Sequence, residues 1–301
     1  MGLLLNFVIG MSAIYLLVSL FVTTIQELIA QLFALRARYL RVGIVKLLEQ
    51  GKSDVSVLAA RTSSAPLVDK FYGNPLIQGL ASSRPGRTAE PSYVSKDTFT
   101  SVALEITGLV ANGTTPERVL EFAERLKGKN NTTPIEHAIA TFAEEAAGNL
   151  KKLQTRLGTW FDESMERVGG AYKRWTQVAT VVIGIVLAVA FNIDTIAISQ
   201  SLLSSPQQAT LFADQVAKLS QSSAADTKLA AQLNAAIEQA KIPFGWKDGG
   251  PASNLLLVLI GWLATGLAAS LGSAFWFDTL KRFVSIRASG AKPSEKPASG
   301  Q

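Results

Sequence analysis

The chain lacks the residues on which several kinds of chemistry depend. Its 301 residues contain no cysteine, which excludes a disulfide framework and thiolate catalysis. The single histidine, His137, excludes a histidine-rich metal site and any catalytic triad that needs a second imidazole. Neither GxGxxG nor GxxxxGK followed by Ser or Thr, the phosphate-binding patterns, occurs. We therefore predict no catalytic residues, no cofactor and no metal ion, and expect the protein not to be an enzyme.

Charged residues are also scarce. They make up 17% of the chain, whereas hydrophobic residues make up 48%. These proportions are high in apolar residues for a soluble protein and low for a transporter with many spans. The composition therefore predicts a few membrane spans together with polar domains.

Three apolar runs are long enough to be these spans. They extend from Leu3 to Leu35, from Trp175 to Ile198 and from Asn254 to Phe277. Each reaches the roughly 20 residues that a helix needs to cross a hydrocarbon core of about 30 Å. A cleaved signal peptide is the alternative for the first run, but no basic residue precedes it and it is too long.

The positions of lysine and arginine predict the orientation of these spans. Of the 29 basic residues, none precedes the first run, 20 lie between Ala34 and Arg174, 4 lie between Ile198 and Ser253, and 5 follow the third run. Loops rich in Lys and Arg remain in the cytoplasm. The amino terminus is therefore predicted to lie outside, and the region after the first run and the tail to lie inside.

The predicted fold is all-α, with three transmembrane helices, a helical cytoplasmic domain and a small helical extracytoplasmic loop. The predicted boundaries are transmembrane helices at 1–35, 175–198 and 254–278, a cytoplasmic domain at 36–174, an extracytoplasmic loop at 199–253 and a basic disordered cytoplasmic tail at 279–301. Within the cytoplasmic domain, helix starts are predicted at Asn74-Pro75, Ser95 and Thr115-Pro116. A capping box of Thr133 and Glu136 opens the longest helix, which is predicted to run to a bend at Gly169-Gly170.

Aromatic and basic residues mark the predicted membrane surface. Aromatic residues gather at the interface between lipid and water, and basic residues contact anionic headgroups. The predicted interface residues are Trp175, Trp276, Phe277, Lys281 and Arg282. Membrane lipids are thus predicted partners. Nucleic acid is not, because the basic excess is concentrated beside the spans.

Small residues recur every four positions in the second and third runs. Such rows allow helix backbones to approach closely within lipid. The predicted helix-packing residues are Thr180, Gly184, Ala188 and Asn192 in the second run and Gly261, Thr265, Ala269 and Ser273 in the third. We predict that these two faces pack on each other or on second copies of themselves. A homo-oligomer is therefore expected.

A polar stripe follows one side of the first run. Its members are Tyr15, Ser19, Thr23, Glu27 and Gln31. Polar side chains inside a membrane must face protein or water. One interpretation is that the stripe supplies hydrogen bonds between packed helices. The other is an ion or proton path in which Glu27 titrates, although no Lys, Arg or His lies within a span to pair with it.

Several longer segments resemble one family. They are "FYGNPLIQGL", "WFDESMERVGGAYKR", "FNIDT", "IPFGW" and "GWLATGLAASLGSAFWFDTLKRF". In this order they resemble a widespread group of uncharacterised bacterial integral membrane proteins, over most of the chain from Phe71 to Arg287. Ala274 departs from the pattern, which has proline there. The resemblance implies the bacterial inner (cytoplasmic) membrane and lends no catalytic residues.

Two functions are consistent with these predictions. The first is a non-enzymatic scaffold or adaptor that anchors the helical cytoplasmic domain at the membrane, for which a cytoplasmic protein is a candidate partner. The alternative is an oligomeric ion channel or transporter lined by the polar stripe of the first span.

Overall fold

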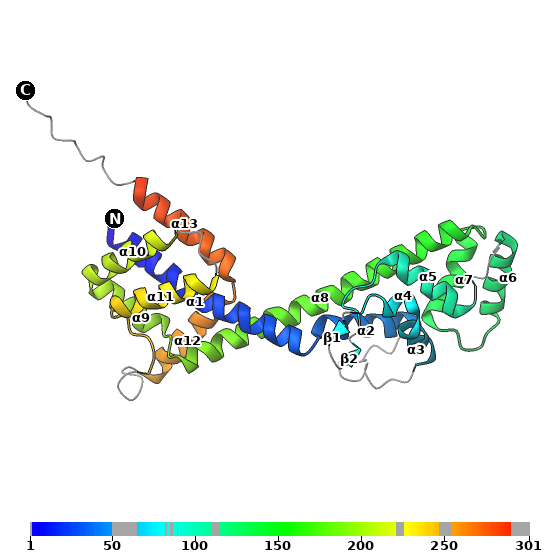
Figure 1. Cartoon of the computed structure of the whole chain (residues 1–301), viewed down its shortest axis with the longest axis horizontal. Helices are drawn as coiled ribbons and strands as arrows, with labels where there is room; N and C mark the ends of the chain where they lie inside the picture. Colours follow the sequence, from blue (N-terminus) through cyan, green and yellow to red (C-terminus); the bar gives the residue numbers. More distant parts are fainter. Residues whose placement is uncertain are drawn as a thin grey trace, which may run out of the picture. The chain divides into compact units, whose positions relative to one another are not determined.

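A computed structural model of the chain describes residues 2–49, 65–81, 83–84, 87–88, 90–109, 115–220, 226–246 and 254–289. Over these residues the protein is all-helical, with 13 helices and one pair of two-residue strands (Figure 1). The chain divides into two compact units. We call residues Ala30–Trp175 the central unit, and Met1–Ile29 together with Thr176–Gln301 the terminal unit.

The central unit is built mainly from short helices. Its elements are α2 (Leu35–Leu48), α3 (Pro66–Gly73), α4 (Pro75–Gln78), β1 (Ser83–Arg84), β2 (Arg87–Thr88), α5 (Lys96–Thr107), α6 (Pro116–Lys127), α7 (Pro134–Glu145) and the first part of α8 (Leu150–Ala190). The strands β1 and β2 pair with each other in antiparallel orientation. Most of the break points carry proline or glycine, which set or permit the backbone angles that end a helix.

The predicted helix starts of the central unit are confirmed. Asn74 caps α4 by accepting a hydrogen bond from the amide of Leu76, and Ser95 caps α5 by accepting one from Thr98. Thr133 and Glu136 form the predicted capping box at the start of α7. Burial raises the pKa of Glu136. Hydrogen bonds from the Lys129 ammonium and the Thr133 amide lower it further than burial raises it, so the net pKa lies below its usual value.

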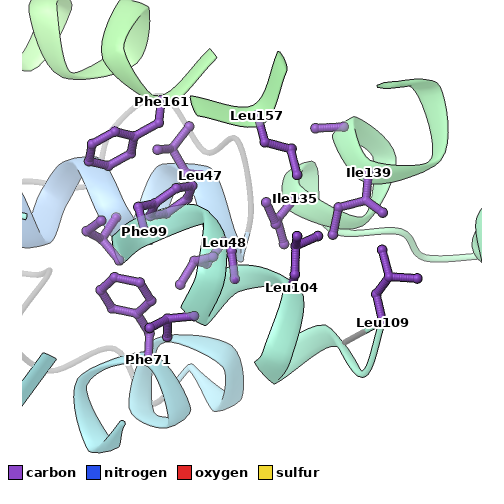
Figure 2. Packing of buried hydrophobic residues seen from close by; sticks show 14 of the residues in the cluster. Leu47, Leu48, Phe71, Phe99, Leu104, Leu109, Ile135, Ile139, Leu157 and Phe161 are labelled. Atoms are coloured by element: carbon purple, nitrogen blue, oxygen red, sulfur yellow. The ribbon is translucent and has the colours of Figure 1, made fainter. Parts of the chain in front are cut away.

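Aromatic rings and branched aliphatic side chains fill the core of the central unit (Figure 2). Phe99 of α5 is fully buried and stacks on Phe161 of α8, with ring centroids 4.3 Å apart. Phe71 of α3 lies on another side of Phe99, with centroids 5.8 Å apart. These contacts fasten α3 and α5 to α8, because each buried phenylalanine contributes about 1.5–3 kcal/mol relative to leaving it exposed.

The long helix predicted to begin at Thr133 is in fact two helices. α7 ends at Glu145, and α8 begins at Leu150 after a turn in which Ala147 and Gly148 both have positive φ. A Cβ atom on Gly148 would lie 2.4 Å from the carbonyl oxygen of Pro116, so only glycine fits there. The predicted bend at Gly169-Gly170 is wrong, since α8 continues through it as one helix of 41 residues.

The terminal unit surrounds the first helix of the chain. Its elements are α1 (Gly2–Leu32, to Ile29), the last part of α8, α9 (Thr195–Ser204), α10 (Pro206–Ser220), α11 (Asp226–Gln239), α12 (Leu255–Ala269) and α13 (Ser273–Ser289). The amino-terminal half of α1 is buried by α9, α10, α11 and α13. Gly10 of α1 allows this close packing, because a methyl group there would lie 3.1 Å from the ring of Phe212 and 3.2 Å from Leu202.

Two helices are long and apolar enough to cross a membrane, and three are if α12 and α13 count as one bent span. The two candidates differ in surroundings. In the most apolar window of α1, 61% of the residues are buried in the protein, whereas in that of α8 only 11% are. The apolar side chains of α8, such as Val178, Val182 and Val186, are therefore exposed.

The third predicted span, 254–278, is not one helix. α12 ends at Ala269, Gly272 adopts a φ of +91°, and α13 leaves at 93° to α12. Alone, α12 has 15 residues and a length of about 22 Å, which is shorter than a hydrocarbon core of about 30 Å.

After the bend α13 packs on α10, and Arg287 of α13 forms an ion pair of 2.6 Å with Asp214 of α10. The predicted tail on one side of the membrane is thus in contact with the predicted loop on the other. A flat bilayer would separate these two segments if the tail and the loop lay on opposite sides of it, as predicted. The rest of the predicted tail, beyond Ser289, lies outside the described residues.

Candidate functional site: a polar network in the terminal unit

A buried carboxylate starts helix α9. Asp194 is 5% exposed, and its Oδ1 accepts hydrogen bonds from the amides of Ile196 at 2.8 Å and Ala197 at 3.3 Å. Aspartate favours this position because it satisfies amides that have no partner within the helix and faces the positive end of the helix dipole. The facing residue on α12 is Gly261. A Cβ atom on Gly261 would lie 1.7 Å from Asp194 Oδ1, so the absence of a side chain makes room for the carboxylate.

Three hydroxyl groups join helices α1, α9 and α12. Thr195 Oγ1 lies 3.2 Å from Tyr15 Oη and 2.8 Å from Thr265 Oγ1. Thr265 is fully buried, and its hydroxyl lies 2.6 Å from the carbonyl oxygen of Ile193 and 2.9 Å from that of Gly261. Since each hydroxyl has a partner, this chain fixes the position of the loop between α8 and α9 without leaving a buried polar atom unpaired.

The end of α8 is closed by side chains from distant parts of the sequence. Trp246 donates from Nε1 to the carbonyl oxygens of Val189 and Ala190, at 3.2 and 3.0 Å. Asn192 accepts from Trp262 Nε1 and donates to the carbonyl oxygen of Gly245, both at 3.2 Å. The last carbonyls of a helix lack intrahelical partners. The two tryptophans and Asn192 therefore join the end of α8 to α12 and to the segment that precedes it.

Helices α8 and α12 meet at two glycines. A methyl group on Gly184 would lie 2.9 Å from the carbonyl oxygen of Gly266, and one on Gly266 would lie 2.8 Å from the backbone nitrogen of Ile185. Both distances are below those of real Cβ contacts, so the two backbones touch directly. Further along the same helix pair, Ala188 packs with Val258 and Trp262. This is the close approach that small residues permit between helices in lipid.

The predicted helix-packing residues are only partly brought together. Gly184 and Ala188 face α12, but Thr180 faces α1, where its hydroxyl donates to Gln26 Oε1 at 2.6 Å. Asn192 lies beyond the end of α8. On α12, Gly261 and Thr265 contact the loop after α8, and Ala269 is buried in the cluster around α1. Ser273 lies beyond the bend, on α13.

The residues of the predicted polar stripe of α1 differ in their burial and in their hydrogen-bond partners. Tyr15 belongs to the hydroxyl chain. Ser19 is fully buried and donates to the carbonyl oxygen of Leu16, and Thr23 donates to that of Ser19. Thr23, Glu27 and Gln31 are exposed in this chain. The hydroxyls of Ser19 and Thr23 thus bond to their own helix, as serine and threonine in helices often do.

The predicted interface residues have mixed surroundings. Trp175 is 37% exposed. Trp276 is half-buried instead of facing outward: it packs on Tyr15 with ring centroids 4.6 Å apart, and its Nε1 donates to the carbonyl oxygen of Ala268 at 2.6 Å. Lys281 lies over the ring of Phe277, with its ammonium 4.1 Å from the centroid, and Arg282 is exposed.

Sequence reasoning missed Asp194, Thr195, Trp262 and Gly266 as members of this network. The hydrogen-bond partners of Asn192, which are Gly245 and Trp262, lie 53 and 70 residues further along the chain. Gly266 lies outside the predicted row of small residues, and only its position on α12 makes it the contact with α8. The sequence did contain a capping aspartate and glycines within an apolar run. This combination does not specify which residues contact one another.

The chemistry of the network is structural. Its polar atoms bond to backbone groups and to one another, and its only carboxylate caps a helix. Among the described residues, no three His, Cys, Asp or Glu side chains gather as they would to hold a metal ion. The arrangement can hold four helices in a fixed relation within an apolar environment.

Comparison with known proteins adds no relative. No family model, curated protein or solved structure matches the chain. The resemblance of its segments to a group of bacterial membrane proteins therefore stays a prediction.

Proposed function

We propose that the protein is a non-enzymatic membrane anchor of the bacterial inner membrane, which holds its central unit at the cytoplasmic surface as a scaffold or adaptor. One observation carries the proposal: α8 ends in an apolar stretch whose side chains have little cover from the protein. Exposed apolar surface costs about 25 cal/mol per Å² in water and nothing comparable in lipid. A continuous exposed face of valine side chains is therefore more stable in a bilayer than in water.

The orientation follows from charge. Arg36, Arg38 and Arg41 follow the apolar part of α1, and Lys173 and Arg174 precede that of α8. Basic residues at both of these ends favour the cytoplasm for the central unit. The amino terminus and helices α9 to α11 then lie outside.

We further propose that α12 and α13 form a re-entrant pair and not a third crossing. The bend of 93° and the ion pair between Arg287 and Asp214 support this arrangement. Lys281, Arg282 and Arg287 then lie on the outer side with α10, against the charge bias. The ion pair with the Asp214 carboxylate lowers the free-energy cost of placing Arg287 on the outer side.

The proposed homo-oligomer has lost part of its support. Gly184 and Gly266 satisfy each other within one chain, so the small-residue faces need no second copy. The remaining support is the exposed aliphatic face of α12, which includes Leu256, Ile260 and Leu267 and which lipid also suits. Native mass measurement in detergent counts the subunits directly.

A channel is the second candidate, because Thr23, Glu27 and Gln31 are exposed polar residues on an apolar helix. Copies of α1 that face one another with these residues would line a pore. The scaffold predicts that proteoliposomes containing the protein pass ions no faster than empty vesicles, with or without the substitution Glu27→Gln.

Ion flux measured with a pH-sensitive or potential-sensitive dye tests this. Glu163→Gln, at an exposed carboxylate of α8 in the central unit, is the matched control. Flux that the protein confers, that Glu27→Gln abolishes and that Glu163→Gln leaves intact would replace the scaffold with the channel.

A further inference from the structure

The central unit contains a cleft between α2 and α8. Its volume is about 520 Å³. Both helices line it, through Tyr39, Val42, Gly43, Lys46 and Leu47 of α2 and Trp160, Ser164, Met165, Arg167, Val168 and Ala171 of α8. A volume of this size falls in the range of sites that bind small molecules.

The two helices meet at Gly43, which lines the cleft. A Cβ atom on Gly43 would lie 2.6 Å from Met165 Cε and 3.1 Å from Val168 Cγ2. At one end Tyr39 meets Tyr172 edge to face, with ring centroids 5.3 Å apart.

The polar lining of the cleft suits an anion. Lys46 reaches it from α2 and Arg167 from α8, and no carboxylate lines it. Among the described residues neither cation forms an ion pair. The acidic neighbours Glu163 and Glu166 do not line the cleft. Both residues are exposed at the mouth of the cleft, and guanidinium and ammonium groups are the usual donors to a phosphate.

A hydroxyl group inside the cleft adds a third donor. Ser164 is 9% exposed, and its Oγ accepts a hydrogen bond from Arg167 Nη2 at 3.3 Å, which leaves its own proton free to donate. Tyr39 adds a phenolic hydroxyl to the lining. The remaining wall is apolar, from Val42, Leu47, Trp160, Met165 and Val168, and so suits a hydrocarbon chain beside the phosphate.

The cleft residues are also close in the sequence to the apolar ends of both candidate spans. Ala171 precedes Trp175 by four residues, which is about 6 Å along a helix. Tyr39 follows Leu32, the last residue of α1, by seven residues. With the proposed orientation, this end of the cleft is at the depth of the headgroups of the inner leaflet. We propose that the cleft binds one anionic phospholipid of that leaflet, with its phosphate between Lys46, Arg167 and Ser164 and its upper acyl chain against the apolar wall.

This inference rests on the proposed membrane anchor. It gives the central unit a specific lipid ligand in addition to general attraction between basic residues and an anionic surface. It also gives a function to Ser164, Lys46 and Arg167, which the membrane anchor alone does not require.

The test is lipid retention by the purified full-length protein. Native mass spectrometry after exchange into detergent would measure binding of added phosphatidylglycerol and of zwitterionic phosphatidylethanolamine. We expect one tightly bound phosphatidylglycerol and weaker binding of phosphatidylethanolamine. The double substitution Lys46→Gln and Arg167→Gln should weaken phosphatidylglycerol binding about tenfold or more. The matched control, Lys151→Gln with Lys152→Gln, removes the same charge from exposed positions of α8 and should change binding less than about twofold.

A second variant separates the cleft from surface charge. Ser164→Leu keeps both cations but fills the cleft, so it should also weaken phosphatidylglycerol binding, with helix content unchanged by circular dichroism. Unchanged binding in Ser164→Leu, or an equal loss in the lysine control, would overturn the proposal. Inorganic phosphate at millimolar concentration should not displace the lipid, and displacement by it would show a phosphate site instead.

The anchor and the cleft fail in different ways. If phosphatidylglycerol does not bind selectively while the protein still partitions into membranes with the central unit inside, only the cleft proposal is wrong. If the protein does not insert at all, the anchor is wrong.

Discussion

Replacement of Gly261 with alanine is expected to lower the free energy of unfolding of the terminal unit by about 2–4 kcal/mol. The added methyl group would lie 1.7 Å from Asp194 Oδ1. Asp194 must then leave its place, and the amides of Ile196 and Ala197 lose their acceptor. Loss of a helix cap costs about 1 kcal/mol, and an extra methyl group in a packed site about 1–3 kcal/mol. Hydrogen exchange at the first turn of α9 and unfolding in mixed micelles measure both effects.

A double-mutant cycle identifies the cause. Asp194→Ser keeps a capping oxygen on a shorter side chain, so by itself it should cost less than about 1 kcal/mol. In that background Gly261→Ala should be milder than in the native chain by about 1 kcal/mol or more. Gly169→Ala on α8 is the control, since no atom lies within 4 Å of its Cβ position, and it should leave stability equal or slightly higher. Additive costs in the cycle would mean that the carboxylate and Gly261 do not meet.

Replacement of Phe99 with alanine should destabilise the central unit by about 3–5 kcal/mol. Phe99 is fully buried between Phe161 and Phe71, so its removal deletes a stacked pair and leaves a cavity that three helices line. Amides of α3, α5 and the first part of α8 should exchange about a hundredfold faster or more, since each 1.4 kcal/mol is tenfold.

Tyr93 provides the comparison for this substitution. It is an aromatic residue of the same unit but is 75% exposed, so Tyr93→Ala should change exchange little. Equal effects of the two substitutions would show that Phe99 does not lie in the core.

Local features of the fold were predictable from the sequence, because they depend on residues a few positions apart. The capping residues Asn74, Ser95 and Thr133 each bond to an amide two or three residues away. Propensity and capping rules read such contacts directly. The same rules failed at Gly148, where a side chain would clash with the carbonyl group of Pro116, 32 residues earlier.

The apolar runs predicted the lengths of the hydrophobic segments but not whether each segment forms one straight helix. The run from Asn254 to Phe277 has enough residues for a span, and its hydropathy is the same for a straight helix and for a bent pair. The bend at Gly272 is held by contacts that composition does not reveal. They include the packing of Trp276 on Tyr15 and the ion pair between Arg287 and Asp214.

The candidate site was predictable only in kind. Small residues in the second and third runs indicated close helix packing, and Gly184 does touch a glycine of α12. Its partner is Gly266, which lies outside the predicted row. A four-residue period locates the packing face of a helix only to within one helical turn. Which residue contacts the other helix depends on the angle at which the two helices cross.

The central claim is that α1 and the apolar part of α8 cross a membrane with the central unit inside the cell. The natural absence of cysteine permits a direct test with single substitutions at exposed positions: Thr155→Cys in the central unit, Gln207→Cys in α10 and Ser285→Cys in α13. A membrane-impermeant maleimide applied to intact cells should label Gln207→Cys and Ser285→Cys. It should label Thr155→Cys only after the membrane is opened. Protection of Ser285→Cys alone would restore a third crossing, whereas labelling of Thr155→Cys in intact cells would contradict the account.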